Sequence, residues 1–212
     1  MKKELIIHIA IGMLYTSSFL VKGNEIDDMW TQTFNLEHQG EYAKAAAIIE
    51  PLLNGDENRE YVLLRYAWLA YQQRNYNDAV RYYKQALKIN PASIDARLGL
   101  SLPLLAQADW NKAEIYLRQI VTISPWNYTA HSRLFVCEEG LRQWEQLAAH
   151  AEEFSRHYPS DTTALVYLAR AKHKLGKNEA ANVIYQQVLI RVPEHIEAIN
   201  YTRTFQNTLG VK

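Results

Sequence analysis

Residues 61–91, YVLLRYAWLAYQQRNYNDAVRYYKQALKINP, contain two apolar runs that are joined by a short polar segment and followed by a proline. In the second run Ala79, Tyr83 and Ala86 recur at steps of three and four residues, the spacing of one buried helix face. The first run is apolar on nearly all sides, which is typical of a helix covered on more than one side. Because a proline costs roughly 3 kcal/mol inside a helix, Pro91 marks the end of the second helix. The stretch therefore predicts a pair of helices.

The same pattern returns along the chain at one fixed step. Four prolines stand one step apart, at Pro91, Pro125, Pro159 and Pro193. Five small-and-large pairs follow the same step, namely Ala45 with Ile49, Ala79 with Tyr83, Ala113 with Leu117, Leu147 with Ala151, and Ala181 with Tyr185. Only the fourth pair exchanges sizes, which roughly conserves the volume of a close-packed helix interface. A fixed period of about 20 to 50 residues indicates a stacked repeat array.

The turns of this array also contain positions that recur at the same interval. The joint between the two helices of each copy is occupied by Gly40, Arg74, Ala108, Arg142, Gly176 and Gly210. Glycine suits a helix that ends in a left-handed residue, and half of the copies place another residue there. Ser93, Asn127 and Asp161 each follow a proline by two residues, so we predict that they are N-caps of the next helix.

Together these residues resemble the tetratricopeptide repeat (TPR), a unit of the same length that consists of two antiparallel helices and a closing proline. The match is strongest at Tyr76, Ala79, Tyr83 and Pro91, and again at Gly176, Ala181, Tyr185 and Pro193. The resemblance implies an all-α fold, a right-handed superhelical solenoid of helix-turn-helix units. We expect a degenerate repeat over 26–59, repeats over 60–93, 94–127, 128–161 and 162–195, and a capping helix over 196–210.

Two single residues carry separate expectations. Pro103 departs from the family pattern because it lies within the first helix of the third repeat, where it should bend that helix or free the carbonyl of Gly99. We favour an adjustment of the superhelix over an opening of the groove. Cys137 is the only cysteine, so it forms no intramolecular disulfide, and its place in a first helix predicts a buried thiol rather than a reactive one.

Residues 1–23, MKKELIIHIAIGMLYTSSFLVKG, lie outside the period. Two lysines precede an apolar run from Leu5 to Val21, and small residues suited to cleavage follow, which is the layout of a secretory signal. As a helix the run spans roughly 26 Å, less than the roughly 30 Å of a bilayer core. We expect a cleaved signal and a periplasmic or exported protein. The alternatives are an uncleaved anchor in the inner membrane facing the periplasm, and an ordinary folded helix.

Charge and motifs exclude several functions. The chain has 23 basic and 23 acidic residues; without residues 1–23, which hold three lysines and one glutamate, 20 and 22 remain. A near-neutral chain lacks the electrostatic attraction that dominates nucleic-acid binding. We find no phosphate loop, paired cysteines or hydrolase motif, and therefore expect neither an enzyme nor a cofactor. His150, Glu153 and His157 share a helix face and could hold a transition metal, but a solvated outer face is the simpler interpretation.

What the resemblance implies is protein binding, because the first helices of TPR arrays line a concave groove that receives a segment of a partner. The family's groove-facing columns correspond here to Trp30, Phe34, Tyr61, Leu64, Trp68, Tyr71, Leu98, Leu102, Leu105, Arg170, His173 and Lys174. The N-terminal part of this set is aromatic and apolar, and apolar patches often mark interaction surfaces. The last three residues suggest a place for an acidic group of the partner. Ordinary packing between helices is the alternative for each aromatic residue.

The sequence thus predicts a non-enzymatic scaffold or adaptor that binds a segment of another protein, in the assembly of a bacterial envelope complex. The bacterial and envelope parts rest on the signal and the resemblance. Two alternatives stay open. In one, the exposed edge of one array stacks on another, so that the protein assembles with itself. In the other, which we consider less favoured, His150, Glu153 and His157 serve a metal-binding protein or an enzyme.

Overall fold

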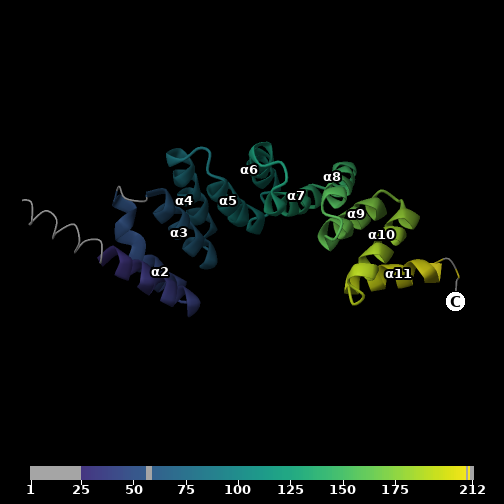
Figure 1. The fold of residues 1–212 in the computed structure, drawn as a ribbon, viewed down its shortest axis with the longest axis horizontal. Helices are drawn as coiled ribbons and strands as arrows, with labels where there is room; N and C mark the ends of the chain where they lie inside the picture. The colour runs from purple at the N-terminus through teal and green to yellow at the C-terminus, as the bar shows by residue number, and fades with distance from the viewer. Residues whose placement is uncertain (1–24, 56–58, 209, 211–212) are drawn as a thin grey trace, which may run out of the picture. The chain divides into compact units, whose positions relative to one another are not determined.

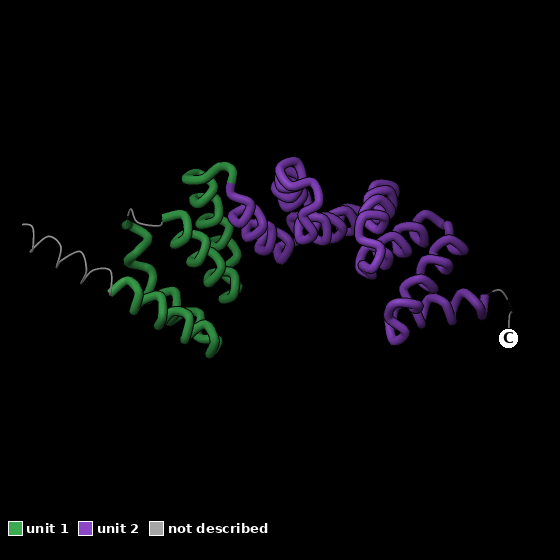
Figure 2. The backbone as a smooth tube through the Cα atoms, in the orientation of Figure 1, with its two compact units in different colours: residues 1–92 green, residues 93–212 purple. Residues whose placement is uncertain are grey.

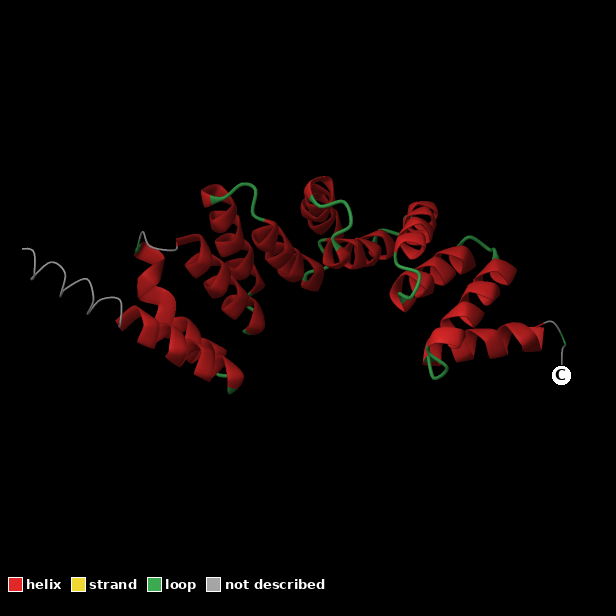
Figure 3. Cartoon of the chain, viewed as in Figure 1, coloured by secondary structure: helices red, strands yellow, loops and turns green. Residues whose placement is uncertain are grey.

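The computed structural model describes residues 25–55, 59–208 and 210, and within these ranges it consists of helices and turns without strands (Figure 3). The expected signal, residues 1–23, lies outside the described residues. Among the residues that are described, no helix is both long and apolar enough to cross a membrane. The described chain forms two compact units, divided between Ala92 and Ser93 (Figure 2).

The first unit holds two helix pairs (Figure 1). A helix over residues 25–38 precedes α2 (Tyr42–Ile49), which continues into the short 3-10 helix η1 (Glu50–Asn54). The second pair is α3 (Arg59–Gln72) and α4 (Tyr76–Ile89). Helix α3 packs against both α2 and α4. It therefore lies between two helices, as its apolar sequence predicts.

The second unit consists of three helix pairs and a last single helix (Figure 1). Its elements are α5 (Ile94–Ala106), α6 (Trp110–Ile123), α7 (Tyr128–Gly140), α8 (Trp144–His157), α9 (Thr162–Lys174), α10 (Asn178–Arg191) and α11 (Ile196–Thr208). Each helix packs against the next along the chain. Helices α5 and α9 also contact α7, so consecutive first helices lie side by side.

The repeating columns form the core between these helices. All five small-and-large pairs of the second helices are buried, including the exchanged pair Leu147 and Ala151. The first helices contribute their own column, of which every member is fully buried: Thr33, Ala67, Ser101, Phe135 and Ala169. Phe135 is the one large side chain in this column, and it packs against Leu147, Phe154 and Tyr167. The fourth copy therefore fills its interior with a different set of side chains than its neighbours do.

The joints confirm that position, and not residue type, sets the left-handed turn. All six joint residues have positive φ, from 56° at Ala108 to 75° at Gly40 and Gly176. Arg74, Ala108 and Arg142 adopt this conformation although it costs a residue with a Cβ about 1 kcal/mol. The stacked helices on both sides impose the turn.

The predicted caps are confirmed as well. The side chains of Ser93, Asn127 and Asp161 accept hydrogen bonds of 3.1, 2.9 and 2.9 Å from the backbone N–H three residues later. Pro91, Pro125, Pro159 and Pro193 lie in the turns after α4, α6, α8 and α10. In the second unit, a proline that ends one helix is followed two residues later by the N-cap of the next helix. Each new copy therefore begins at the same position of the repeat.

Pro103 and Cys137 are both inside the second unit. Helix α5 runs from Ile94 to Ala106 with Pro103 buried in its last turns. The thiol of Cys137 is fully buried, and burial raises its pKa to about 12. The prediction of a buried thiol at this position is therefore confirmed, and the raised pKa disfavours the thiolate, which is the reactive form.

Candidate protein-binding surfaces

In the first unit, the groove-facing columns form an aromatic surface, which we define by Trp30, Phe34, Tyr61, Arg65 and Trp68. The ring centroid of Trp30 lies 6.4 Å from that of Phe34, one helix turn later, and 5.0 Å from that of Tyr61 on α3. Tyr61 and Phe34 are 46% and 36% exposed. Large side chains rarely stay this exposed next to one another without a partner. The surface therefore offers ring faces to a ligand.

Arg65 holds this aromatic surface together. Its guanidinium carbon lies 4.7 Å from the ring centroid of Phe34 and 4.6 Å from that of Trp68, so the cation stacks on both rings. The same guanidinium forms an ion pair with Glu37, whose side chain is 7% exposed. Burial lowers the pKa of Arg65 from its ordinary value, but an arginine stays charged at any physiological pH. Arg65 was not among the predicted groove residues, because the groove-facing columns of this helix fall at Leu64 and Trp68.

The other predicted groove residues of this unit are less available. Leu64 and Tyr71 are half-buried, and the ring of Tyr71 packs 5.9 Å from that of Tyr76. Trp68 makes an edge-to-face contact with Tyr42 at 5.8 Å. Leu64 and Tyr71 thus pack beside the aromatic surface, and Trp68, a member of that surface, also packs against a neighbouring helix, as the alternative of packing between helices predicted.

In the second unit, Leu98, Leu102 and Leu105 of α5 are all half-buried. Arg133 of α7 donates to the backbone oxygen of Leu98 and, at 2.8 Å, to the hydroxyl of Ser101. This side chain ties α7 to the start of the leucine row. The row is thus partly covered, and it is less exposed than the rings of the first unit.

Arg170 is engaged within the second unit instead of being presented to a partner. Its guanidinium donates to both oxygens of Glu197 on α11, at 2.8 and 2.5 Å, and lies 3.3 Å from Glu139 on α7. Tyr185 donates to Glu197 at 2.6 Å. The hydrogen bond from Arg170 lowers the pKa of Glu197, and the carboxylate in turn raises the pKa of Arg170. Glu197 therefore stays ionised, and the expectation that Arg170 meets an acidic group of a partner loses its basis.

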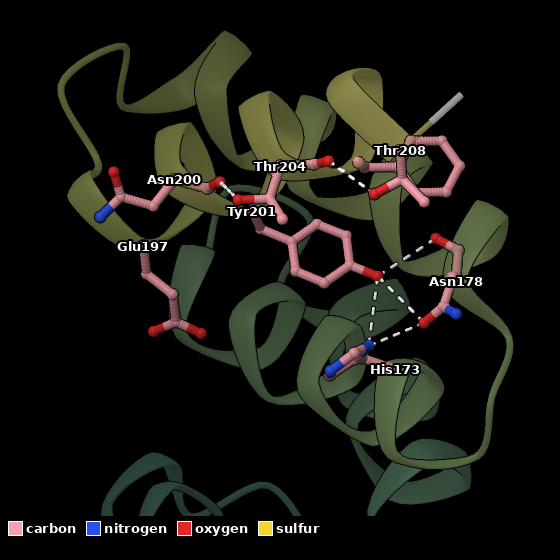
Figure 4. A pocket seen from close by; sticks show the side chains of 8 residues that line it. His173, Asn178, Glu197, Asn200, Tyr201, Thr204 and Thr208 are labelled. Atoms are coloured by element: carbon pink, nitrogen blue, oxygen red, sulfur yellow. Dashed lines mark hydrogen bonds between the residues drawn. The ribbon is translucent and has the colours of Figure 1, made fainter. Parts of the chain in front are cut away.

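A pocket of about 460 Å³ lies beside this ion pair, between α9, the start of α10, and α11 (Figure 4). It is lined by His173, Asn178, Glu197, Asn200, Tyr201, Thr204, Phe205 and Thr208. Most polar groups of the pocket wall form hydrogen bonds with other groups of the protein. Thr204 and Thr208 donate to carbonyls of their own helix at 2.9 Å, and the Tyr201 hydroxyl lies 3.3 Å from the backbone oxygen of Asn178. Rings and methyl groups are left to contact a ligand.

His173 belongs to this pocket and Lys174 does not. Nδ1 of His173 lies 2.7 Å from Oδ1 of Asn178, and its ring packs 5.2 Å from that of Tyr201. Lys174 is exposed. The predicted groove residues did not include Glu197, Asn200, Tyr201 or Thr204. One further period along the groove columns would have found two of them, because it leads from Arg170 to Thr204 and from Val166 to Asn200.

The residues considered for a metal site do not form one cluster. His150 turns into the interior, where its Nδ1 lies 2.9 Å from Glu138, while Glu153 is exposed. His157 stacks on Trp126 with ring centroids 3.8 Å apart. Within the described residues, no group of three or more His, Cys, Asp or Glu side chains is arranged to hold a metal ion.

Comparison with known sequences identifies the repeat. Family models described as "tetratricopeptide repeat" match residues 70–121 and 163–195. Both segments are thus similar to the tetratricopeptide repeat. They include α4, α5, most of α6, and the α9–α10 pair, so the matched helices come from both units. No curated protein matches the chain.

Solved TPR structures share the fold over most of the chain. A tetratricopeptide repeat protein from Parabacteroides merdae is 10% identical, covers 89% of this chain and 75% of its own, and gives a TM-score of 0.78. MamA from Desulfovibrio magneticus RS-1 is 15% identical over 81% of this chain and 97% of its own, with a TM-score of 0.73. YrrB, described as a TPR protein with an unusual peptide-binding site, is 15% identical over 81% and 88%, with a TM-score of 0.70. The predicted all-α TPR fold is confirmed.

Proposed function

We propose that this protein is a non-catalytic scaffold that binds a segment of another protein through the groove-facing side of its first helices. The TPR fold supports a protein-interaction role in general. A peptide-binding site is named for the similar YrrB structure, and the present chain has exposed rings on two of its first helices. The observation that carries the proposal is the aromatic surface of the first unit.

The aromatic surface suits apolar or aromatic side chains of the partner. Two exposed rings, Phe34 and Tyr61, stand beside half-buried Trp30, and Arg65 fixes their support. Rigid rings lose little conformational entropy when they bind, so they contribute disproportionately to binding energy. The pocket between α9 and α11 is a second contact point, and its ring and methyl lining accepts an apolar side chain as well.

The experiment truncates the two exposed rings, Phe34 and Tyr61, and leaves Arg65, which supports them, unchanged. Partners are first captured with the intact protein from solubilised envelope, and the bound segment is then made as a peptide and measured by calorimetry. Phe34→Ala with Tyr61→Ala should weaken the peptide at least tenfold. The matched control is Ile115→Ala with Ile123→Ala, which removes two side chains of similar exposure on α6. Equal loss in both variants, or no loss in either, would overturn the role of the aromatic surface.

Association of the protein with itself is the alternative. End-to-end stacking needs apolar terminal faces, but the exposed residues of helix 25–38 are polar except for Phe34. On α11 the exposed residues are polar except for Ile196. The two described ends therefore favour binding of a partner. A molar mass by light scattering that rises with concentration in the micromolar range would instead support self-association.

We also propose that the protein acts in the bacterial envelope, where it helps to assemble a complex. The support is the lysine-led apolar run of residues 1–23. Cleavage would release the array into the periplasm, and an uncleaved segment would keep it at the inner membrane. Fractionation and the intact mass of the protein separate these outcomes, because cleavage removes residues 1–23 from the purified chain. Recovery of the full-length chain from the cytoplasm would contradict export.

A further inference from the structure

A line of three hydrogen bonds crosses the interior of the second unit. Nε2 of His131 lies 2.7 Å from the backbone oxygen of Pro125, and Nδ1 of His131 lies 2.7 Å from Nε2 of His150. Nδ1 of His150 then lies 2.9 Å from Oε2 of Glu138. Glu138 is fully buried and His131 is 8% exposed. We call His131, His150 and Glu138 the relay; it connects the turn after α6 with α7 and α8.

Further charged and polar side chains from two helices face the relay. They are Arg118 and Glu114 on α6, and Gln146, Glu153 and His157 on α8. Arg118 and Gln146 each donate to Oε1 of Glu138 at 3.2 Å, and both also bond to Glu114. Glu153 acts on His131 through its charge, and His157 is held by Trp126, which also stacks on His131 at 5.8 Å.

The fold itself does not require these polar residues. In most other copies of the period, apolar or aromatic residues occupy the same columns; the charged exceptions are Arg97 in the column of His131 and Lys172 in that of Glu138. The position of His131 corresponds to Leu63 and Leu165, that of Glu138 to Leu36 and Leu104, and that of His150 to Tyr82 and Tyr116. Buried ionisable groups commonly cost stability compared with apolar residues of similar volume. In no other copy do ionisable residues occupy all three columns, so the fourth copy carries a costly arrangement that the others do not share.

The geometry allows one proton in each hydrogen bond. A carbonyl only accepts, so Nε2 of His131 must carry a proton toward Pro125. One proton lies between His131 and His150, because two would collide in a gap of 2.7 Å and none would set lone pair against lone pair. One proton lies between His150 and Glu138. With three protons, the two imidazoles and the carboxylate have no net charge.

We propose that the relay makes the second unit pH-responsive, because uptake of one more proton breaks the bond between His131 and His150 and loosens the packing of α7 on α8. A fourth proton has no acceptor within the line and adds an uncompensated positive charge in the interior. The effect reaches a groove-facing residue, since α7 also carries Glu139, which pairs with Arg170. The proposal does not depend on the identity of a partner.

The direction of the pH effect follows from His131. Burial is the main cause that lowers the pKa of His131 in the folded chain. In the unfolded chain the pKa of this imidazole has its ordinary value of about 6.5. The folded chain therefore takes up the extra proton only at a lower pH than the unfolded chain does. Between these two pKa values the unfolded state binds more protons, and stability rises with pH. The contribution of the relay is therefore complete above about pH 6.5 and is lost as the pH falls below it.

Thermal unfolding of the chain and of a matched apolar variant tests the proposal. The variant His131→Leu, Glu138→Leu, His150→Tyr takes each replacement from the same column of another copy. Between pH 7.5 and pH 5.5 the Tm of the native chain should fall at least about 3 °C further than that of the variant. The other five histidines are present in both proteins, so this difference isolates the relay. Equal decreases in the two proteins would overturn the proposal.

Nitrogen-15 NMR of the imidazoles gives a second readout that needs no variant. At pH 7.5 His131 should be neutral, with its proton on Nε2 and with Nδ1 unprotonated. Its titration midpoint should lie below the ordinary imidazole value of about 6.5, and the helix signals of α7 and α8 should broaden or shift at the same midpoint. A midpoint of 6.5 or above for His131, or a proton on Nδ1 at pH 7.5, would contradict the relay.

Discussion

The two units use the same groove-facing columns in opposite ways. In the first unit a half-buried arginine, Arg65, stacks between the rings of Phe34 and Trp68, and the rings Phe34 and Tyr61 remain exposed. In the second unit the arginine itself, Arg170, occupies a groove column, and it forms ion pairs with the carboxylates of Glu139 and Glu197. The difference teaches that the repeat fixes where a side chain lies, while neighbours from adjacent first helices decide whether it is available to a partner.

Both arginines pair with a glutamate on an adjacent first helix. Arg65 reaches back to Glu37, and Arg170 reaches forward to Glu197. The side chain of Glu37 is 7% exposed, whereas that of Glu197 is 34% exposed. Since water screens the more exposed pair, the first unit should depend far more on its ion pair than the second.

The largest effect is therefore expected for Arg65→Ala. It leaves the buried Glu37 carboxylate without its cation and removes the support of Phe34 and Trp68, which together should cost about 3 to 5 kcal/mol of unfolding free energy. Chemical denaturation followed by circular dichroism measures this change. The double variant Arg65→Met, Glu37→Leu should regain most of the loss, because it removes both charges. A double variant as unstable as Arg65→Ala would show that ring stacking, and not the ion pair, holds the first unit.

A smaller effect is expected for Glu197→Gln, which keeps the shape of the side chain and removes its charge. Partial exposure limits the loss to about 1 to 2 kcal/mol at neutral pH. Because Arg170 lowers the pKa of Glu197, the contribution of the carboxylate is present above the unfolded value of about 4.3 and is lost as the pH falls through the folded pKa.

The difference in stability between the native chain and Glu197→Gln should consequently shrink between pH 5 and pH 3, and also as salt increases. Unfolding curves at several pH values and salt concentrations measure it. A difference that stays constant with pH would mean that the variant acts through packing against Tyr185 and not through charge.

Most of the fold is predictable from the sequence because it depends on local and periodic signals. The caps Ser93, Asn127 and Asp161 act on a backbone N–H three residues away, and the prolines stop helices by their own geometry. Even the exchange of Leu147 and Ala151 is visible in the sequence, since buried volume is conserved across the pair. Such signals require no knowledge of distant residues.

The availability of site residues depends on distant partners and is harder to predict. The columns place Arg170 toward the groove, but Glu197 is 27 residues later and Glu139 is 31 residues earlier, two spacings that the repeat period does not reveal. Helical spacing likewise groups His150 with His157. In the structure His150 turns inward to Glu138 and His157 stacks on Trp126, because buried partners outweigh the shared helix face.

The smallest effect concerns the joints, where both units should behave alike. Gly176 has a φ of 75°, and no atom lies within 4 Å of an added Cβ, so Gly176→Ala should cost about 1 kcal/mol through backbone strain alone. Conversely, Arg74→Gly in the first unit and Arg142→Gly in the second should each stabilise by at most about 1 kcal/mol, because the left-handed residue then loses its strain. Thermal unfolding of the three variants measures these shifts.

Gains of equal size at Arg74 and Arg142 would confine the contrast between the units to their groove-facing side chains. A gain in one unit and a loss in the other would mean that the joint arginines also make unit-specific contributions, and the contrast would extend into the scaffold itself.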